Sequence, residues 1–138
     1  MRLVLDTNEF IGALDVIKNP SSKLLLDKLL DSFPQHTISI PRTIVNEVRR
    51  NVSSAIFTQF LTAIRPIATI DEDCLVPFEV GAKYESLGLK PADAFIAAYC
   101  EWTEANFLVT ENRHFLTRSN FLPFKVITAH ACLKLFDK

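Results

Sequence analysis

The chain has 138 residues, which is the length of one ordinary domain. Its hydrophobic content of 49% excludes a disordered or low-complexity chain. The 15 basic and 16 acidic residues give a formal net charge of -1, which excludes a broad basic surface as the main means of holding DNA or RNA. An enzyme that acts on nucleic acid through an acidic site remains compatible with this charge.

The three cysteines, Cys74, Cys100 and Cys132, are far apart, and no C-x-x-C pair occurs. This pattern indicates neither a disulfide framework nor a zinc site, so we expect buried free thiols. The apolar run at residues 3–5 meets Asp6 at once and is too short for a signal peptide, and no segment reaches membrane-spanning length. We therefore expect a cytoplasmic protein with no membrane partner.

Short apolar runs alternate with amphipathic stretches along the chain. Residues 3–5 form a compact apolar run that ends at Asp6 and predicts a buried strand. Leucines at helical spacing between charged residues predict an amphipathic helix over residues 22–31. Pro41 ends a short predicted strand at residues 37–40 and suits the entry to a helix. The remaining predicted helices cover residues 42–51, 53–64, 77–87, 92–104 and 129–136, and the remaining predicted strands cover residues 67–70, 107–110 and 125–128.

This alternation predicts the fold class. Strands that alternate with helices form a mostly parallel sheet with helices on both faces. We therefore expect an α/β protein, a three-layer α/β/α sandwich with a central mostly parallel sheet, as a single domain over residues 1–138. In such sheets ligands bind beyond the carboxyl ends of the strands, so residues that directly follow strands are the candidate site residues.

Three carboxylates lie where an isolated charge is costly. Asp6 directly follows the first predicted strand, and Asp93 is the only charged residue between Ala92 and Cys100 in an apolar predicted helix. Glu47 borders the apolar stripe of its predicted helix. Because an unpaired carboxylate near a core is strongly disfavoured, the three together favour a cation partner, either an arginine or a metal.

Each carboxylate also has a purely structural explanation. Asp6 is followed by Thr and Asn, which is good turn chemistry. Asp93 lies in the first turn of its predicted helix, where the dipole favours a negative charge. Glu47 has Arg50 or Asn51 as a partner on its own helix. Taken singly, the structural explanation is preferred for Glu47, whereas the three together favour a common site.

A magnesium or manganese site is the chemistry that such a group suits best. Carboxylate oxygens are the hard ligands that Mg²⁺ and Mn²⁺ prefer. The cation would offset the mutual repulsion of the carboxylates, activate water and stabilise charge on a phosphate under attack. His36, His114 and His130 are scattered, so no histidine cluster competes with this interpretation.

Four segments, in order, resemble the motifs of the PIN-domain ribonucleases. They are L-D-T-N at residues 5–8, P-R-T-I-V-N-E-V at residues 41–48, L-K-P-A-D-A-F-I-A-A at residues 89–98 and T-E-N-R-H-F at residues 110–115. The resemblance implies a sandwich with a central parallel sheet and an acidic pocket at its carboxyl edge. It also implies a metal-dependent endoribonuclease that hydrolyses RNA phosphodiester bonds with Mg²⁺ or Mn²⁺, as in the VapC-like toxins of toxin–antitoxin pairs.

The resemblance assigns a role to each matching position. Asp6, Glu47 and Asp93 would be the acidic catalytic residues, and Asp6 and Asp93 would bind the metal. The fourth acidic position of the family falls on Asn112, whose amide can coordinate a metal but carries no charge. Asn112 stays in the predicted catalytic set, and we expect any second metal to be held weakly. The residues that would support the site are Thr7, Asn8 and Thr110.

Asn112 also supports an alternative from another functional class, a catalytically inactive PIN-fold protein that binds RNA or serves as a scaffold. A haloacid-dehalogenase-like phosphatase is disfavoured, because its D-x-D motif would need an acid where Asn8 stands. A phospho-receiver domain is disfavoured because residues 110–113 contain no lysine.

The expected partners are an RNA substrate, an antitoxin protein and a second copy of the chain. Candidate contacts to the RNA backbone follow the last motif, at Arg113, His114 and Arg118, and follow Glu47, at Arg49 and Arg50, although solvated surface residues show the same pattern. The predicted helices at residues 22–31 and 53–64 are candidates for a homodimer surface or an antitoxin groove. Trp102 and the 11 phenylalanines have helical and strand spacing, which assigns them to the core rather than to base stacking.

Overall fold

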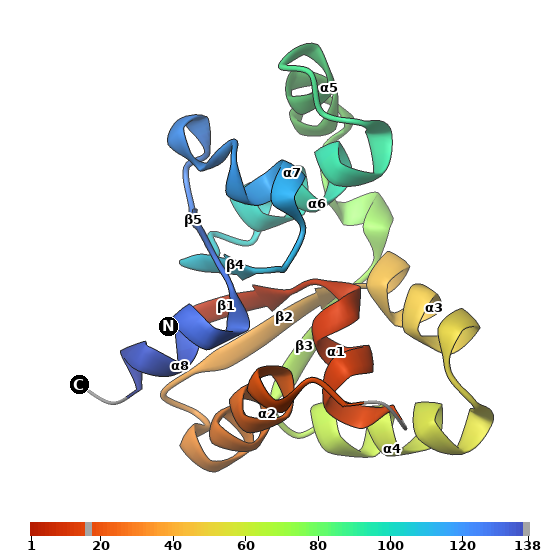
Figure 1. Cartoon of the computed structure of the whole chain (residues 1–138). Coiled ribbons are helices and arrows are strands. Elements are labelled where there is room, and N and C mark those ends of the chain that lie inside the picture. Colours follow the sequence, from red (N-terminus) through yellow and green to blue (C-terminus); the bar gives the residue numbers. More distant parts are fainter. Residues whose placement is uncertain (16–17, 137–138) are drawn as a thin grey trace.

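The computed structural model describes residues 1–15 and 18–136, and its centre is a sheet whose strands all pair in parallel (Figure 1). The order of the described strands is β3-β2-β1-β4-β5, so the first strand of the chain lies in the middle. This arrangement confirms the predicted α/β sandwich. The strands are β1 (Arg2–Leu5), β2 (Thr37–Pro41), β3 (Ala68–Asp71), β4 (Phe107–Val109) and β5 (Lys125–Ile127).

The central strand β1 is covered on both faces, which explains its continuous apolar sequence. Leu3 and Val4 are fully buried and Leu5 is nearly so. In register, Leu5 of β1 lies beside Val109 of β4, and both strands end at this level. The residues that follow them, Asp6 and Thr110, therefore meet at the carboxyl edge of the sheet.

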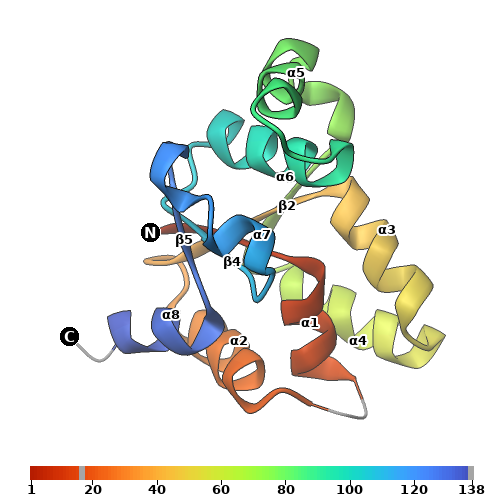
Figure 2. The same ribbon diagram turned by 45° about the horizontal axis from the view of Figure 1, so that its top comes forward.

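The helices form two layers. In Figures 1 and 2, α5, α6 and α7 lie on one side of the sheet, whereas α1, α2, α4 and α8 lie on the other and α3 extends from the end of β2. The strand order reverses direction at β1, and right-handed crossovers on either side of such a reversal place helices on opposite faces. The helices are α1 (Thr7–Leu14), α2 (Pro20–Ser32), α3 (Arg42–Asn51), α4 (Ser54–Ile64), α5 (Phe78–Ser86), α6 (Pro91–Trp102), α7 (Arg113–Leu116) and α8 (Ala129–Leu135), with short 3-10 turns η1 (Asp73–Leu75) and η2 (Ser119–Phe121).

Two helices, α1 and the short α7, were absent from the sequence prediction. Residues 6–8 suit a turn, but Asp6 is instead the N-cap of α1, and its side chain accepts a hydrogen bond from the amide of Thr7. Aspartate favours both turns and helix starts, so the local sequence does not separate the two. The predicted elements are all present, with boundaries that move by at most two residues.

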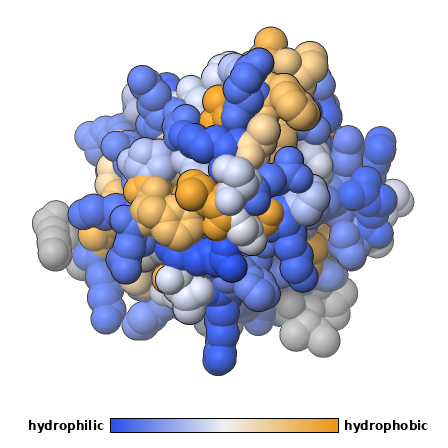
Figure 3. Space-filling model, turned by 90° about the horizontal axis from the view of Figure 1, so that it is seen from above, coloured by the Kyte–Doolittle hydropathy of each residue, from blue (hydrophilic) through white to orange (hydrophobic). Residues whose placement is uncertain are grey.

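Two predictions about burial were wrong in part. Cys100 and Cys132 are buried free thiols, but Cys74 is exposed in η1. Several aromatic side chains assigned to the core lie at the surface, above all Phe78, which is 82% exposed on α5. Figure 3 shows hydrophobic residues in patches among hydrophilic ones on the face seen from above. The other exposed aromatic residues are Phe33, Trp102 and Phe121.

The helices within residues 1–15 and 18–136 are all too short or too polar to cross a lipid bilayer.

Candidate active site

Asp6 is fixed at the carboxyl edge of the sheet by three hydrogen bonds. Its backbone amide donates to the carbonyl of Val109 at 2.9 Å, which continues the pairing of β1 with β4. Its Oδ1 accepts from the amide of Thr7 at 2.8 Å, and its Oδ2 accepts from the hydroxyl of Thr110 at 2.8 Å. Thr110 is fully buried. The half-buried carboxylate is therefore held in one orientation by residues of two neighbouring strand ends.

Glu47 is joined to this group through Thr7. The hydroxyl of Thr7 donates to Oε2 of Glu47 at 2.7 Å, and Thr7 is only 6% exposed. Glu47 lies on the middle turn of α3, next to the buried Val48 on the same helix. Thr7 at the start of α1 thus orients two carboxylates, that of Asp6 through its amide and that of Glu47 through its hydroxyl. The structural partners expected for Glu47, Arg50 and Asn51, do not contact its carboxylate, although Asn51 donates to its backbone carbonyl.

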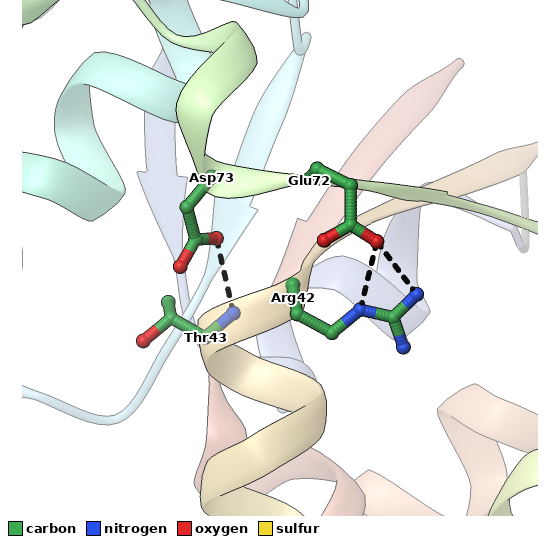
Figure 4. A network of polar contacts seen from close by, with 4 residues as sticks. All are labelled: Arg42, Thr43, Glu72 and Asp73. Carbon is green, nitrogen blue, oxygen red and sulfur yellow. Dashed lines mark hydrogen bonds and ion pairs between the residues drawn. The ribbon is translucent and has the colours of Figure 1, made fainter.

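The start of α3 is anchored by the segment after β3 (Figure 4). Pro41, the N-cap residue of α3, offers no side-chain cap. Asp73 supplies one from elsewhere, because its Oδ1 accepts from the backbone amide of Thr43 at 3.1 Å. Beside it, Arg42 donates from Nε and Nη2 to Oε1 of Glu72 at 3.2 and 3.0 Å. Both partners of that ion pair are exposed, so the Asp73 cap is the stronger anchor of the helix that carries Glu47.

Asp93 reaches the same edge from the other helical layer. It lies in the first turn of α6, and this helix is tied to the sheet by Tyr99, whose hydroxyl donates to Asp71 at 2.6 Å. The Asp93 carboxylate makes no hydrogen bond or ion pair with any residue in the described part of the chain. It faces a cavity of about 90 Å³. The cavity is lined by Gly88, Leu89, Lys90, Asp93, His114 and Arg118.

Asn112 is used locally as a helix cap. Its Oδ1 accepts from the amide of His114 at 2.9 Å, which makes it the N-cap of α7. Its backbone amide donates to the Thr110 hydroxyl at 3.0 Å. The side chain is therefore oriented by α7, and its remaining hydrogen-bonding capacity is that of a neutral amide.

The other predicted site residues are exposed. Asn8 lies on the outer side of α1, Arg49 lies in the last turn of α3, and Arg113 and His114 lie on α7. Within the described residues none of their side chains is hydrogen-bonded to Asp6, Glu47 or Asp93. Of the predicted set, the structure links Asp6, Glu47, Thr7 and Thr110 by hydrogen bonds, with Asn112 attached through its backbone.

Glu9 is an acidic residue that the sequence prediction missed. It is only 2% exposed on α1, and burial, together with the hydrogen-bonded and charged Glu111, raises its pKa to about 8. Ser22 of α2 lies 3.4 Å from Oε1. Glu111 also accepts from the amide of Ala129 at the start of α8, at 3.1 Å. Glu9 is the only charged residue of α1, and this isolation in an apolar helix was the available signal.

The donor chemistry of these residues fits a hard divalent cation. An ionised carboxylate has about four acceptor sites, and Asp6 uses two of them while Glu47 uses one. The remaining oxygen lone pairs suit Mg²⁺ or Mn²⁺. Across residues 1–15 and 18–136, however, no group of three or more histidine, cysteine, aspartate or glutamate side chains is arranged to hold a metal ion. The acidic side chains of the described residues therefore do not form a complete protein cage for a metal ion.

No family model and no curated protein matches the sequence. Solved structures match it over nearly the whole chain. VapBC2 from Rickettsia felis bound to a promoter DNA fragment has a TM-score of 0.60 at 22% identity, over 92% of this chain and 97% of that chain.

The FitAcB structure from Neisseria gonorrhoeae has a TM-score of 0.61 at 17% identity, over 93% of this chain and 98% of that one. FitAB bound to the IR36 DNA fragment gives 0.61 and 17%, over 92% and 94% of the two chains. These are toxin–antitoxin complexes whose toxin chains are PIN-domain, VapC-like proteins. The chain described here therefore has the PIN-domain fold.

Proposed function

We propose that the chain is a metal-dependent endoribonuclease that hydrolyses RNA phosphodiester bonds and acts as the toxin of a toxin–antitoxin pair in the cytoplasm. The observation that carries the proposal is the pair of oriented carboxylates, Asp6 and Glu47, held by Thr7 at the carboxyl edge of the sheet. Rigid placement of two unneutralised carboxylates is costly for a purely structural purpose and useful for binding a cation. The fold shared with the toxin chains of VapBC2 and FitAB supports the same proposal.

Asp6 and Asp93 would hold the metal, which when bound supplies Lewis-acid stabilisation of charge on the scissile phosphate. Thr110 keeps Oδ2 of Asp6 in place, so the carboxylate meets the cation without reorienting. Glu47 would accept the proton of the attacking water at Oε1, because Oε2 is already occupied by the Thr7 hydroxyl. The water oxygen would bond to phosphorus as the bond to the 3′-oxygen breaks, and the leaving oxygen would take a proton from solvent, which gives a 5′-phosphate and a 3′-hydroxyl.

The proposal is tested by cleavage of single-stranded and structured RNA with Mn²⁺ or Mg²⁺ and after chelation, comparing the native chain with Asp6→Asn. We expect cleavage only by the native chain with metal. Asp27→Asn is the matched control, since Asp27 lies on the surface of α2 in an exposed ion pair with Lys23. Cleavage that survives both chelation and Asp6→Asn would exclude the proposed mechanism.

A catalytically inactive PIN-fold RNA-binding or scaffold protein is the second candidate. It is favoured by the neutral Asn112, whose side chain caps α7, and by the incomplete cage of acidic ligands in the described residues. The two candidates differ in metal binding. A nuclease should gain thermal stability with Mn²⁺ by linkage, and an inactive scaffold should not.

An antitoxin is the partner that we propose on the strength of the VapBC2 and FitAB complexes. Of the two helices predicted as partner surfaces, α2 exposes large apolar side chains, with Leu24 53% and Leu30 37% exposed. The large apolar residues of α4 are at least half covered, so α2 is the better candidate. Co-purification with an antitoxin that is lost after Leu24→Ser would support this assignment.

A further inference from the structure

The small cavity beside Asp93 is built from three separate segments. Gly88, Leu89 and Lys90 belong to the connection from α5 to α6, Asp93 belongs to α6, and the other wall comes from α7 and the turn after it. We call it the Arg118 pocket. Its volume of about 90 Å³ equals the space of about three water molecules, which is the scale of one phosphate group rather than of a base or a sugar.

The guanidinium of Arg118 lies against the backbone at Gly88. Gly88 has a φ of +99°, in the region that favours glycine, and its amide caps α5 by donating to Glu85 at 3.0 Å. A Cβ built on Gly88 would lie 3.1 Å from Nη1 of Arg118. The glycine therefore serves two purposes: it ends α5 and leaves room for the Arg118 side chain against the backbone.

The basic side chains of the pocket have no acidic partner in the part of the chain that the structure describes. Within the described residues, Lys90, His114 and Arg118 make no side-chain hydrogen bond or ion pair. Asp93 lines the same cavity, yet no ion pair of 4.0 Å or less joins it to any of them. Elsewhere in the chain opposite charges pair directly, as Lys83 does with Glu101 at 2.6 Å.

This separation of charges defines what the pocket can bind. Lys90 and Arg118 line the pocket from its two sides and suit the oxygens of a phosphate, which guanidinium binds in a two-pronged geometry. Asp93, in the first turn of α6 next to Lys90, would repel an anion unless a cation lies between them. A phosphate would fit the pocket if it contacted Arg118 and Lys90 and faced the metal that Asp93 is proposed to bind.

We propose that the Arg118 pocket binds one backbone phosphate of the RNA, adjacent to the phosphate that is cleaved. This inference rests on the proposed nuclease function. It assigns Arg118 and Lys90 to substrate positioning, and it predicts that they act on binding of the RNA rather than on the chemical step. Phosphate contacts of this kind are independent of base identity, so the pocket sets the register of the strand and not its sequence.

The first test compares native chain and Arg118→Gln in cleavage of a short single-stranded RNA with Mn²⁺. We expect KM to rise about tenfold with kcat within about twofold, which corresponds to the loss of one charge-assisted hydrogen bond. The slope of log KM against log salt concentration should fall by about 0.7, the value for one phosphate contact on a single strand. Arg65→Gln is the matched control, because Arg65 is an exposed residue at the end of α4. An unchanged KM and salt slope for Arg118→Gln would overturn the proposal.

Two further variants, Lys90→Gln and Arg118→Lys, test whether the effect of Arg118→Gln comes from misfolding. Lys90 is exposed and makes no side-chain cap, so Lys90→Gln should keep the native melting temperature and still raise KM in the same direction. Arg118→Lys keeps the positive charge and should recover part of the salt slope. Loss of binding by Arg118→Gln alone, with native values for both of these variants, would contradict a phosphate pocket.

A second arm measures binding without cleavage. Fluorescence anisotropy of the same RNA is recorded in the presence of a chelator, with inorganic phosphate as a separate probe. Weaker RNA binding by Arg118→Gln than by Arg65→Gln supports the pocket even when no RNA is cleaved, which separates this inference from the nuclease proposal. If Arg118→Gln abolishes stabilisation by inorganic phosphate but leaves RNA affinity unchanged, the pocket binds free phosphate and the proposal is wrong.

Discussion

The hydroxyl of Thr110 donates a 2.8 Å hydrogen bond to Oδ2 of Asp6, and this bond joins the ends of two neighbouring strands. The same hydroxyl accepts from the amide of Asn112 at 3.0 Å. One buried oxygen therefore orients the candidate metal ligand and fixes the loop that leads to α7. Its removal affects both partners at once.

Thr110→Val keeps the side-chain shape and removes this oxygen. We expect the free energy of unfolding to fall by about 1–3 kcal/mol, because two polar groups lose their partner. We also expect a smaller gain in melting temperature with Mn²⁺, since Asp6 is no longer held. Urea unfolding and a Mn²⁺ titration measure the two effects. Thr58→Val on exposed α4 is the control and should change neither by much.

Substitutions of Asn112 separate its role as a cap from its lack of charge. Asn112→Ala removes the cap of α7 and should cost about 1 kcal/mol of stability. Asn112→Asp keeps a capping oxygen and adds a carboxylate, so it should bind Mn²⁺ more tightly than the native chain and raise any cleavage rate. Thermal shift and RNA cleavage at equal metal concentration provide the comparison. Weaker metal binding by the aspartate variant would show that residue 112 does not face the cation.

The buried Glu9 should make stability depend on pH. Its pKa in the folded chain is about 8, above the ordinary value of 4.5, so between these values the folded state binds the extra proton. Stability therefore falls as pH rises through this window, by up to about 1.4 kcal/mol per pH unit. Glu9→Gln removes the titration while keeping a polar side chain next to Ser22.

The measurement for Glu9 is the difference in unfolding free energy between native chain and Glu9→Gln across that window. The difference should shift in favour of the glutamine variant as pH rises and level off above about pH 8. Glu79→Gln, at an exposed position of α5, should give a flat difference. A flat profile for Glu9→Gln as well would mean that Glu9 is ionised throughout.

Asp73 caps α3 from outside that helix, so its loss should destabilise the helix that carries Glu47. Asp73→Ala leaves the amide of Thr43 without its partner and should lower stability by about 1 kcal/mol. Asp73→Asn keeps an acceptor oxygen and should recover most of this. Glu72→Ala, which breaks only the exposed ion pair with Arg42, should cost less. Urea unfolding of the three variants decides whether the cap or the ion pair anchors the helix.

Sequence periodicity was sufficient to predict the layers of the fold, because strands and helices differ strongly in the spacing of their apolar residues. The start of α1 was not predictable in the same way, because Asp6 suits a turn and a helix cap equally. The position of Asp6 after a buried strand was informative, since the edge of a parallel sheet gathers strand-end residues. Its bond to Thr110 follows from the register of β1 and β4, which depends on contacts 104 residues apart.

The contacts of the acidic residues were also not predictable from the local sequence. Glu47 was expected to pair within its own helix, whereas its partner Thr7 comes from a helix absent from the prediction. Glu9 carried a visible signal, a lone charge among apolar neighbours, but its partner Glu111 lies far along the chain. Pairings of this kind depend on how helices pack on the sheet, and local sequence does not encode that packing directly.

The central position of β1 has a consequence for synthesis. In a nascent chain Asp6 is made before β4, which lies beside β1, and before the Thr110 hydroxyl, which orients its carboxylate. Until Thr110, 104 positions after Asp6, has been synthesised, the Asp6 carboxylate lacks the hydroxyl that orients it. Assembly of the acidic edge is thus a late event in translation, and a truncated product that ends before β4 should be inert.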